Sequence, residues 1–337
     1  MRRGPIVALL GIGALAAAIA TAVALLFPWL PHPASDERDR IDFVTWFTVA
    51  ICIAIFAVVA AVMIYAVIRF RAAPDDDSDG SPVHGNTQLE IIWTLVPTVL
   101  VTAIAIVSAV VLARNDALAK DTLTIDVTAQ QFAWSFTYPE AKNLTTGTLR
   151  VPLGRSVDLH FTSKDVIHSF WVQEFGQKQD TVPGIQTHLH ITPNKVGTYP
   201  VICTELCGLG HAVMRTEVVV MPAAAFDKWL KGQTSQTSSS STGTSGLAVF
   251  TNNQCSGCHT LRAANAQGKI GPDLDKLPQY AQQAGQSDLA GFIRQSIVQP
   301  NDYVQPGFPK NVMPPFDLPK PQLDALVQYL IQSSKKG

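Results

Sequence analysis

One short stretch of the chain gathers side chains that bind soft metal ions. They are Cys203, Glu205, Cys207, His211 and Met214, with His168 upstream. Thiolate and imidazole ligands select copper, zinc or iron over magnesium or calcium. A structural zinc site more often uses two closely spaced cysteine pairs and no methionine. The methionine therefore favours copper.

The two cysteines of this stretch indicate how many copper ions it binds. A single blue-copper ion requires only one cysteine, whereas two thiolates can bridge two ions and spread an added electron over both. The remaining ligands would be two imidazoles, one thioether and one backbone carbonyl, from His168, His211, Met214 and Glu205. We predict a dinuclear electron-transfer centre and keep a single copper ion as the alternative.

A second redox motif lies near the C-terminus, where Cys255, Cys258 and His259 form a Cys-x-x-Cys-His sequence. Two thiols at this spacing attach covalently to the vinyl groups of a porphyrin, and the histidine takes one face of the iron. The two motifs use every cysteine except Cys52, so a disulfide framework is excluded. Cys52 lies in an apolar run and is predicted to act as a small hydrophobe.

The composition indicates a membrane protein. At 337 residues the chain is long enough for several domains, and its formal net charge of -1 gives no reason to expect a nucleic-acid partner. Charged residues make up 15%, against about 25% in soluble proteins. The uncharged apolar stretches 6–30, 44–68 and 91–113 each exceed the roughly 20 residues that a helix needs to cross a bilayer.

The first apolar stretch has two interpretations. Arg2 and Arg3 precede it, and the small residues Ala22 and Ala24 offer a cleavage site, as in a secretory signal. Residues 1–30 are therefore either a signal peptide or a retained signal anchor.

The other two stretches predict a transmembrane helical hairpin over residues 43–114. Arg69 and Arg71 follow the first helix of this hairpin, and the positive-inside rule places the connecting loop in the cytoplasm. Everything after Ala113 then lies outside the cytoplasm.

The remaining chain falls into three parts. Residues 120–231 alternate apolar and polar side chains in short runs separated by Gly, Pro, Asn and Asp, which predicts a β-sandwich or barrel with a short helix near 226–230. Residues 232–246 are rich in Ser, Thr and Gly and predict a flexible linker. The final block, 247–337, is small but could fold around a large apolar cofactor.

The metal-binding stretch and two upstream segments, 163–172 and 175–184, resemble subunit II of the haem-copper cytochrome c oxidases. The resemblance extends from the second apolar stretch to about Leu230. It implies a cupredoxin-like domain with a dinuclear copper centre, CuA, outside a bacterial plasma membrane. It also implies subunits I and III as partners. Quinol-oxidizing relatives lack the copper ligands, all of which are present here.

Some roles follow from this resemblance alone. The side chain of Glu205 would reach a magnesium ion shared with subunit I, and Glu90 would mark the entrance of a proton channel into subunit I. Alternatively, Glu90 only caps the start of a membrane helix. Phe132 replaces the first tryptophan of the family motif, where electrons arrive from soluble cytochrome c, and Trp134 retains the second. We place both aromatic residues on the electron path.

The C-terminal block resembles a class I cytochrome c, an all-α fold. Its haem motif is followed by Gly271-Pro-Asp-Leu274, by Met313 with two prolines after it, and by an amphipathic helix near the end. The resemblance implies Met313 as the second axial ligand of haem c. A tethered haem domain makes electron delivery intramolecular, which fits the loss of the tryptophan at position 132.

Together these features predict an electron-transfer subunit of a cytochrome caa-type, proton-pumping oxidase. Electrons would come from an upstream cytochrome c or a quinol–cytochrome c reductase-type donor. They would pass from haem c to CuA and reach haem a in subunit I, where oxygen is reduced to water. The alternatives are the CuA subunit of a nitric oxide reductase and a copper-delivery or assembly protein. The other histidines singled out, His84, His160, His188 and His190, are expected to be structural or surface residues.

Overall fold

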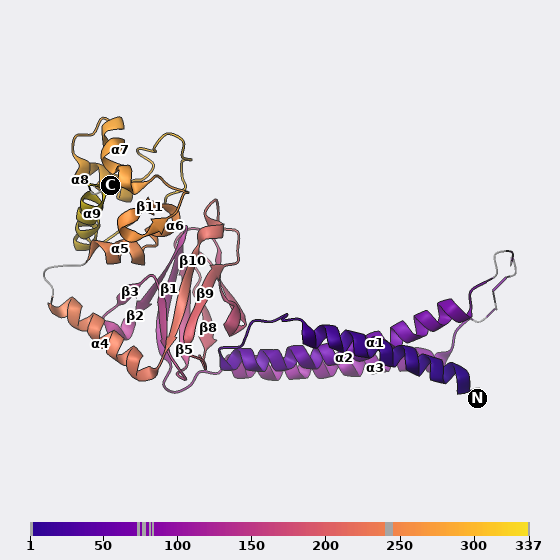
Figure 1. Cartoon of the computed structure of the whole chain (residues 1–337). Helices are drawn as coiled ribbons and strands as arrows, with labels where there is room; N and C mark the ends of the chain where they lie inside the picture. The colour runs from indigo at the N-terminus through magenta and orange to yellow at the C-terminus, as the bar shows by residue number, and fades with distance from the viewer. Residues whose placement is uncertain are drawn as a thin grey trace. The chain divides into compact units, whose positions relative to one another are not determined.

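The computed structural model describes residues 3–72, 75, 79–80, 82, 84–239 and 245–335. It divides into two compact units, and Figure 1 labels many of their helices and strands. The first unit comprises Met1–His32 and Asp39–Asn115, and the second comprises Pro33–Arg38 and Asp116–Gly337.

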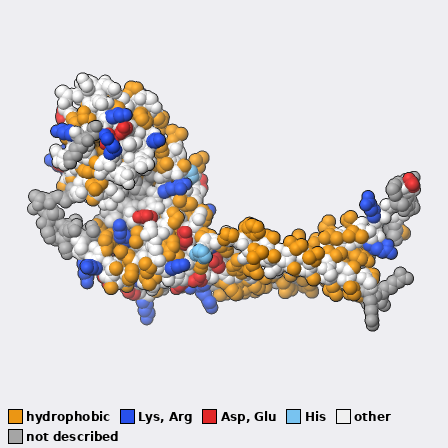
Figure 2. Space-filling view, in the orientation of Figure 1, with side chains coloured by type: hydrophobic (Ala, Val, Ile, Leu, Met, Phe, Trp, Pro, Cys, Tyr) orange, Lys and Arg blue, Asp and Glu red, His pale blue; other side chains and the backbone are white. Residues whose placement is uncertain are grey.

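The first unit consists of three long apolar helices. They are α1 (Arg3–Leu26), α2 (Asp36–Arg69) and α3 (Thr87–Asn115). Among the described residues each contains a segment long and apolar enough to span a membrane, with mean hydropathy of 2.5, 3.0 and 2.6. Hydrophobic side chains cover most of these helices on the face shown in Figure 2, and Leu10, Val67 and Trp93 are more than half exposed. The predicted hairpin is confirmed, and the first stretch forms a third apolar helix.

The second unit begins with a β-sandwich, as the alternating sequence predicts. One sheet has the order β3-β2-β1-β5-β8 and the other β4-β10-β9-β6-β7. The strands of the first sheet are β1 (Leu123–Gln130), β2 (Ala133–Tyr138), β3 (Leu144–Thr146), β5 (Val157–Ser163) and β8 (Thr187–Ile191). Those of the second are β4 (Leu149–Pro152), β6 (His168–Val172), β7 (Gln177–Thr181), β9 (Gly197–Cys203) and β10 (Arg215–Met221).

The core between the sheets follows from the period of two along each strand. In β1, side chains alternate between buried and half-buried positions, because successive residues of a strand point to opposite faces. Ile125, Val127, Leu159, Phe161 and Phe170 are completely buried between the sheets. This packing gives the loops at the strand ends a rigid base.

The metal-binding stretch is such a loop. It connects β9, which ends at Cys203, with β10, which begins at Arg215, and contains the short helix η3 (His211–Val213). His168 is the first residue of β6, and β6 pairs with β9 so that Phe170 lies opposite Cys203. The sheet therefore brings His168 beside the loop despite their separation in sequence.

The C-terminal part of this unit is mainly helical and has its own core. Its elements are α5 (Gly246–Asn252), α6 (Cys255–Cys258), β11 (Thr260–Leu261), β12 (Ala266–Gln267), α7 (Leu277–Gln283), α8 (Leu289–Val298) and α9 (Lys320–Ser334). Leu323, Leu326, Val327 and Leu330 of α9 are buried, as their spacing indicates. At the crossing of α5 and α9, a Cβ on Gly246 would collide with Ala325 and Tyr329. The lack of a side chain there allows the close packing.

The helix before the predicted linker is longer than expected. It runs as α4 from Ala223 to Ser239, into the segment predicted as linker. Once a helix has begun, each further residue adds a hydrogen bond at little cost, so serine and threonine can extend it. Residues 240–244, the centre of the predicted linker, lie outside the described residues. The other short 3-10 helices are η1 (Pro139–Ala141), η2 (Gln173–Phe175), η4 (Arg262–Ala264) and η5 (Leu274–Lys276).

Candidate metal centre and cofactor pocket

The predicted copper ligands meet in one buried cluster. The Sγ atoms of Cys203 and Cys207 lie 3.8 Å apart, and the Sγ of Cys203 lies 3.3 Å from the carbonyl oxygen of Glu205. The Sγ of Cys207 lies 3.5 Å from Nδ1 of His211 and 3.8 Å from Sδ of Met214. The remaining donor, Nδ1 of His168, lies 4.0 Å from the Sγ of Cys203. All the donors predicted from the sequence are thus brought together.

These distances suit metal binding and not a disulfide. A disulfide requires about 2.0 Å between sulfur atoms, and both cysteines are free. A metal–thiolate bond is about 2.3 Å long, so two sulfurs 3.8 Å apart can both bind the same ion. The donors of His168, Cys203 and Cys207 all lie within 4.8 Å of one another. The soft donor set fits copper.

Asp165 orients His168 and was not predicted from the sequence. Its Oδ1 lies 2.9 Å from Nε2 of His168, so Nδ1 is the nitrogen that faces the cysteines. Its Oδ2 accepts a hydrogen bond from the backbone N–H of Gln131 at 2.6 Å. A carboxylate behind a metal-binding histidine fixes the ring and raises its basicity. The sequence does contain one indication of this role, because Asp165 lies only three residues before His168.

The two thiols of the cluster differ in acidity. Burial raises the pKa of Cys203, but hydrogen bonds, foremost from His168, outweigh it and lower the pKa to about 7. Burial and the negative charge of Cys203 raise the pKa of Cys207 to about 12. Burial lowers the pKa of His168, but its hydrogen bonds with Asp165 and Cys203 give a net rise. Without a metal ion, the cluster therefore accommodates one thiolate more readily than two.

Gln131 and Phe132, in the turn between β1 and β2, contact the metal-binding loop. The side-chain amide of Gln131 donates to the carbonyl oxygen of Cys207 at 2.6 Å. The ring of Phe132, 9% exposed, lies so close to the loop that a Cβ on Gly210 would collide with it. Trp134 is completely buried, and its ring meets His168 edge to face at 6.1 Å. Both aromatic residues therefore contact the ligand cluster or its loop.

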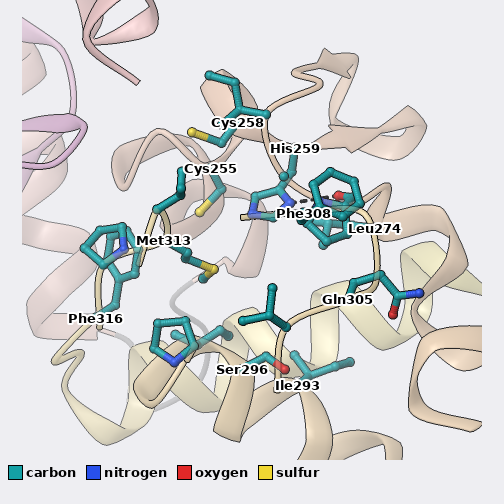
Figure 3. A pocket seen from close by; sticks show the side chains of 18 of the residues that line it. Cys255, Cys258, His259, Leu274, Ile293, Ser296, Gln305, Phe308, Met313 and Phe316 are labelled. Carbon is teal, nitrogen blue, oxygen red and sulfur yellow. Dashed lines mark hydrogen bonds between the residues drawn. The ribbon is translucent and has the colours of Figure 1, made fainter. Parts of the chain in front are cut away.

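The haem motif lines a large apolar pocket. Cys255, Cys258, His259 and Met313 all belong to its wall, and Figure 3 shows their side chains around the same space. Most of the lining is apolar, and the two thiols and the imidazole of the motif share one wall. This lining suits an apolar porphyrin that is attached through two thioethers and bound at its iron by the histidine.

The surroundings of His259 leave its Nε2 atom available to bind iron. Its Nδ1 lies 2.8 Å from the carbonyl oxygen of Pro272, so Nδ1–H donates there and Nε2 stays free as a ligand. Burial lowers the pKa of His259 and keeps the ring neutral. A Cβ on Gly271 would collide with this ring, which explains the glycine. Burial also raises the pKa of Cys255, to about 12, and that of Cys258.

The pocket also touches the strand that supports the metal cluster. Phe132 and Ala133 contribute to its wall. Gln254, the residue before Cys255, donates from its side-chain amide to the carbonyl oxygens of Trp134 and Gly147, both at 3.3 Å. Residues 132–134 thus contact the haem motif on one side and the metal-binding loop or its ligands on the other.

Glu90 and Glu205 are both exposed. Glu90 is in the first turn of α3, where its Oε1 accepts the backbone N–H of Asn86 and Asn86 in turn accepts from Leu89, each at 3.2 Å. This reciprocal arrangement caps the helix, the simpler of the two roles expected for Glu90. Glu205 is exposed, although its carbonyl faces the cluster.

Comparisons with known proteins cover both sites and the membrane helices. Three family models match in order: cytochrome c oxidase subunit II, transmembrane domain, over residues 21–111; its periplasmic domain over 145–221; and cytochrome c over 244–334. Together the matched segments contain α2, most of α3, the metal-binding loop and the haem motif.

Individual relatives agree. Cytochrome c oxidase subunit 2 of Alkalihalophilus pseudofirmus is 32% identical over 289 residues, covering 81% of each chain. That of Thermostichus vulcanus is 33% identical over 253 residues, covering 59% of this chain and 77% of the relative. The crystal structure of the periplasmic domain of subunit II from Bradyrhizobium japonicum is 27% identical, covers 36% of this chain and 99% of that one, and gives a TM-score of 0.34.

Replacing Asp165 with asparagine should weaken copper binding by about 10–100-fold, because the histidine loses the carboxylate that orients it. The full-length chain in detergent would be titrated with a chelator and its retained copper measured. Asp116→Asn, a change at an exposed carboxylate, is the matched control. Equal copper retention in the two variants would contradict the role of Asp165.

Copper binding should strengthen as the pH rises from 6 to 8. Both cysteines must bind as thiolates, and the pKa of Cys203 is about 7 while that of Cys207 is about 12. At pH 6 copper must displace the thiol protons of both Cys203 and Cys207. At pH 8 Cys203 is mostly ionised, so copper must displace only the proton of Cys207, and its affinity is higher. Competition for Cu⁺ against a chromophoric chelator, with proton release recorded, measures this dependence. A pH-independent affinity would show that the thiols are already ionised.

Proposed function

Since the chain belongs to the cytochrome c oxidase subunit II family and carries a fused cytochrome c domain, we propose that it transfers electrons from haem c through CuA to haem a of the oxidase. The chain is a membrane-anchored oxidase subunit. We propose a bacterial plasma membrane as its location and subunits I and III as its partners. Oxygen reduction and proton pumping take place outside this chain.

The donor cluster is the strongest support for this proposal. It gathers two thiols, two imidazoles, a thioether and a carbonyl oxygen with neighbouring separations of 3.3–4.0 Å. Bound there, two copper ions supply one-electron transfer. His168, Cys203 and Cys207 are buried, which excludes water and keeps the ligands in place when the charge changes. A copper-delivery protein would need more accessible ligands for exchange.

The haem pocket supplies the second half of the proposal. Cys255 and Cys258 would hold haem c covalently, and His259 and Met313 would bind its iron. Ligation by histidine and methionine raises the reduction potential of a haem. Such a haem is suited to receive electrons from a soluble cytochrome c or from a quinol–cytochrome c reductase-type donor.

We infer that residues 132–134 form the route between the two centres. Phe132 lies in the wall of the haem pocket and against Gly210 of the metal-binding loop. Trp134 accepts a hydrogen bond from Gln254 through its backbone and meets His168 through its ring. An aromatic contact at position 132 is retained although the family's tryptophan is absent. The tethered domain thus provides a donor that needs no separate docking.

Two further roles belong to the assembled complex. We propose that Glu205 contributes to a magnesium site shared with subunit I, which its exposed side chain allows. We also propose that Glu90 marks the start of a proton path into subunit I, in addition to capping α3. Its exposed position at the helix start suits contact with another subunit.

The proposal is tested on the complex that co-purifies with this chain from detergent-solubilised membranes. A reduced-minus-oxidised spectrum with haem extraction should show haem a beside haem c. Haem b with haem c and without haem a would support a nitric oxide reductase or an oxidase with a different haem. The absence of any second haem would overturn the assignment to a haem-copper complex.

Replacing Phe132 with leucine should slow electron transfer between haem c and CuA, because the contact between the pocket wall and the metal-binding loop is lost. The rate would be followed after rapid photoreduction of the haem in the intact complex. Phe175→Leu, at a buried phenylalanine outside both sites, is the control. Equal rates in the two variants, with both cofactors retained, would exclude a role for Phe132 in the route.

A further inference from the structure

Three histidines and two aspartates gather on one sheet of the β-sandwich, away from the sulfur ligands. The register places Asp126 opposite His160 and His160 opposite His188, across strands β1, β5 and β8. In the neighbouring row, Asp158 lies opposite His190. We refer to these five residues as the histidine cluster. From the sequence these histidines are expected to be structural or surface residues, but the register places two carboxylates beside them.

Asp158 is at the centre of the histidine cluster. Its Oδ2 lies 2.8 Å from Nε2 of His160. Its Oδ1 lies 3.2 Å from Nε2 of His190 and 3.5 Å from Nδ1 of His188. The rings of His160 and His188 meet at a centroid distance of 4.5 Å. One carboxylate therefore faces three imidazoles.

The central carboxylate lacks a hydrogen bond on one oxygen. Asp158 is 7% exposed, and its buried Oδ1 has no hydrogen-bond partner among the described residues. Leaving a buried carboxylate oxygen without a partner is costly. The imidazole nitrogens of His190 and His188 lie 3.2 and 3.5 Å from this oxygen, but neither forms a hydrogen bond of good geometry with it. An ion between these groups would satisfy the oxygen.

The spacing fits a tetrahedral zinc ion. Zinc bonds to nitrogen and oxygen are about 2.0–2.1 Å long, so two ligand atoms on one tetrahedral ion lie about 3.3 Å apart. The separation of 3.5 Å between Oδ1 of Asp158 and Nδ1 of His188 is close to this value. Ligand atoms of Asp158, His160 and His188 all lie within 4.8 Å of one another. Small side-chain rotations would close the remaining gaps.

The neighbours of these groups support the same arrangement. Oδ1 of Asp126 lies 3.6 Å from Nδ1 of His160, on the far side of the ring from Asp158. A proton on Nδ1 would face Asp126 and leave Nε2 free as a ligand, as in carboxylate–histidine–zinc sites. The side chain of His188 is 46% exposed, which gives an ion access from solvent.

We propose that Asp158, His160 and His188 bind a zinc ion, with Asp126 and His190 orienting the ligands. Two histidines and one carboxylate are a donor set that zinc uses when one coordination position stays open to water or another ligand. The ion would link β5 to β8, which is the edge strand of its sheet. This inference is independent of the proposed electron-transfer function.

The test measures zinc binding by the full-length chain in detergent, purified with an affinity tag that contains no histidine. The protein is first saturated with copper, so that the sulfur ligands are occupied, and then dialysed against Zn²⁺. Metal content is determined by mass spectrometry. We expect about one zinc per chain, as for a single three-ligand site, and a higher melting temperature in zinc, because the ion binds only the folded state.

The decisive variant replaces His160 and His188 with glutamine. We expect its zinc affinity to fall by at least about tenfold, while copper absorption and the melting temperature without zinc stay close to wild type. The matched control is a variant in which His32 and His84, which are not part of the cluster, are replaced with glutamine. This control variant should bind zinc with the affinity of the wild type. Asp158→Asn should also lose zinc and provides a second test if the double variant fails to fold. Equal zinc binding by a folded cluster variant, or none by the wild type, would overturn the proposal.

Discussion

The close approach of two buried thiols is the constraint on which the electron-transfer site depends. Two negative charges on sulfur atoms 3.8 Å apart are unfavourable, and burial together with the charge of Cys203 raises the pKa of Cys207. If both residues were flexible, the two sulfur atoms would move apart. Cys203 is fixed because it ends one strand of a packed sheet, and Cys207 is held by the hydrogen bond from Gln131 to its carbonyl oxygen. The rigidity of the sheets therefore keeps the thiols where positive ions are needed to stabilise both charges.

The parts of this architecture that could be predicted are those that depend on residues close together in the sequence. The cysteine loop, the haem motif, the apolar helices and the buried face of α9 depend on spacings of a few residues. Residue types and spacing also predicted the copper ligands, including His168, and the likeness of the C-terminal block to class I cytochrome c implied Met313 as a haem ligand. The alternating pattern identified strands but could not reveal which strands are neighbours.

The features that escaped prediction depend on pairing across the fold. Asp165 acts on His168 only because the start of β6 turns both side chains toward each other. The histidine cluster arises from the parallel pairing of β1 with β5 and the antiparallel pairing of β5 with β8, a register that no local pattern gives. The contact of Gln254 with Trp134 likewise joins residues far apart in the sequence. The extension of α4 to Ser239 shows helix propagation overriding weak propensities.

The different pKa values of the cysteines also determine which of them is most easily oxidised before the metal ions and the haem are bound. Oxidation proceeds through thiolates, and Cys203, with a pKa of about 7, is partly ionised at neutral pH beside a second sulfur. The haem-binding thiols, Cys255 and Cys258, have raised pKa values, so a smaller fraction of them is ionised and open to oxidation. In an oxidising compartment the unmetallated loop is thus the vulnerable point of a newly made chain. Cys203 and Cys207 then stay reduced only if copper binds, or a reductant acts, before they are oxidised.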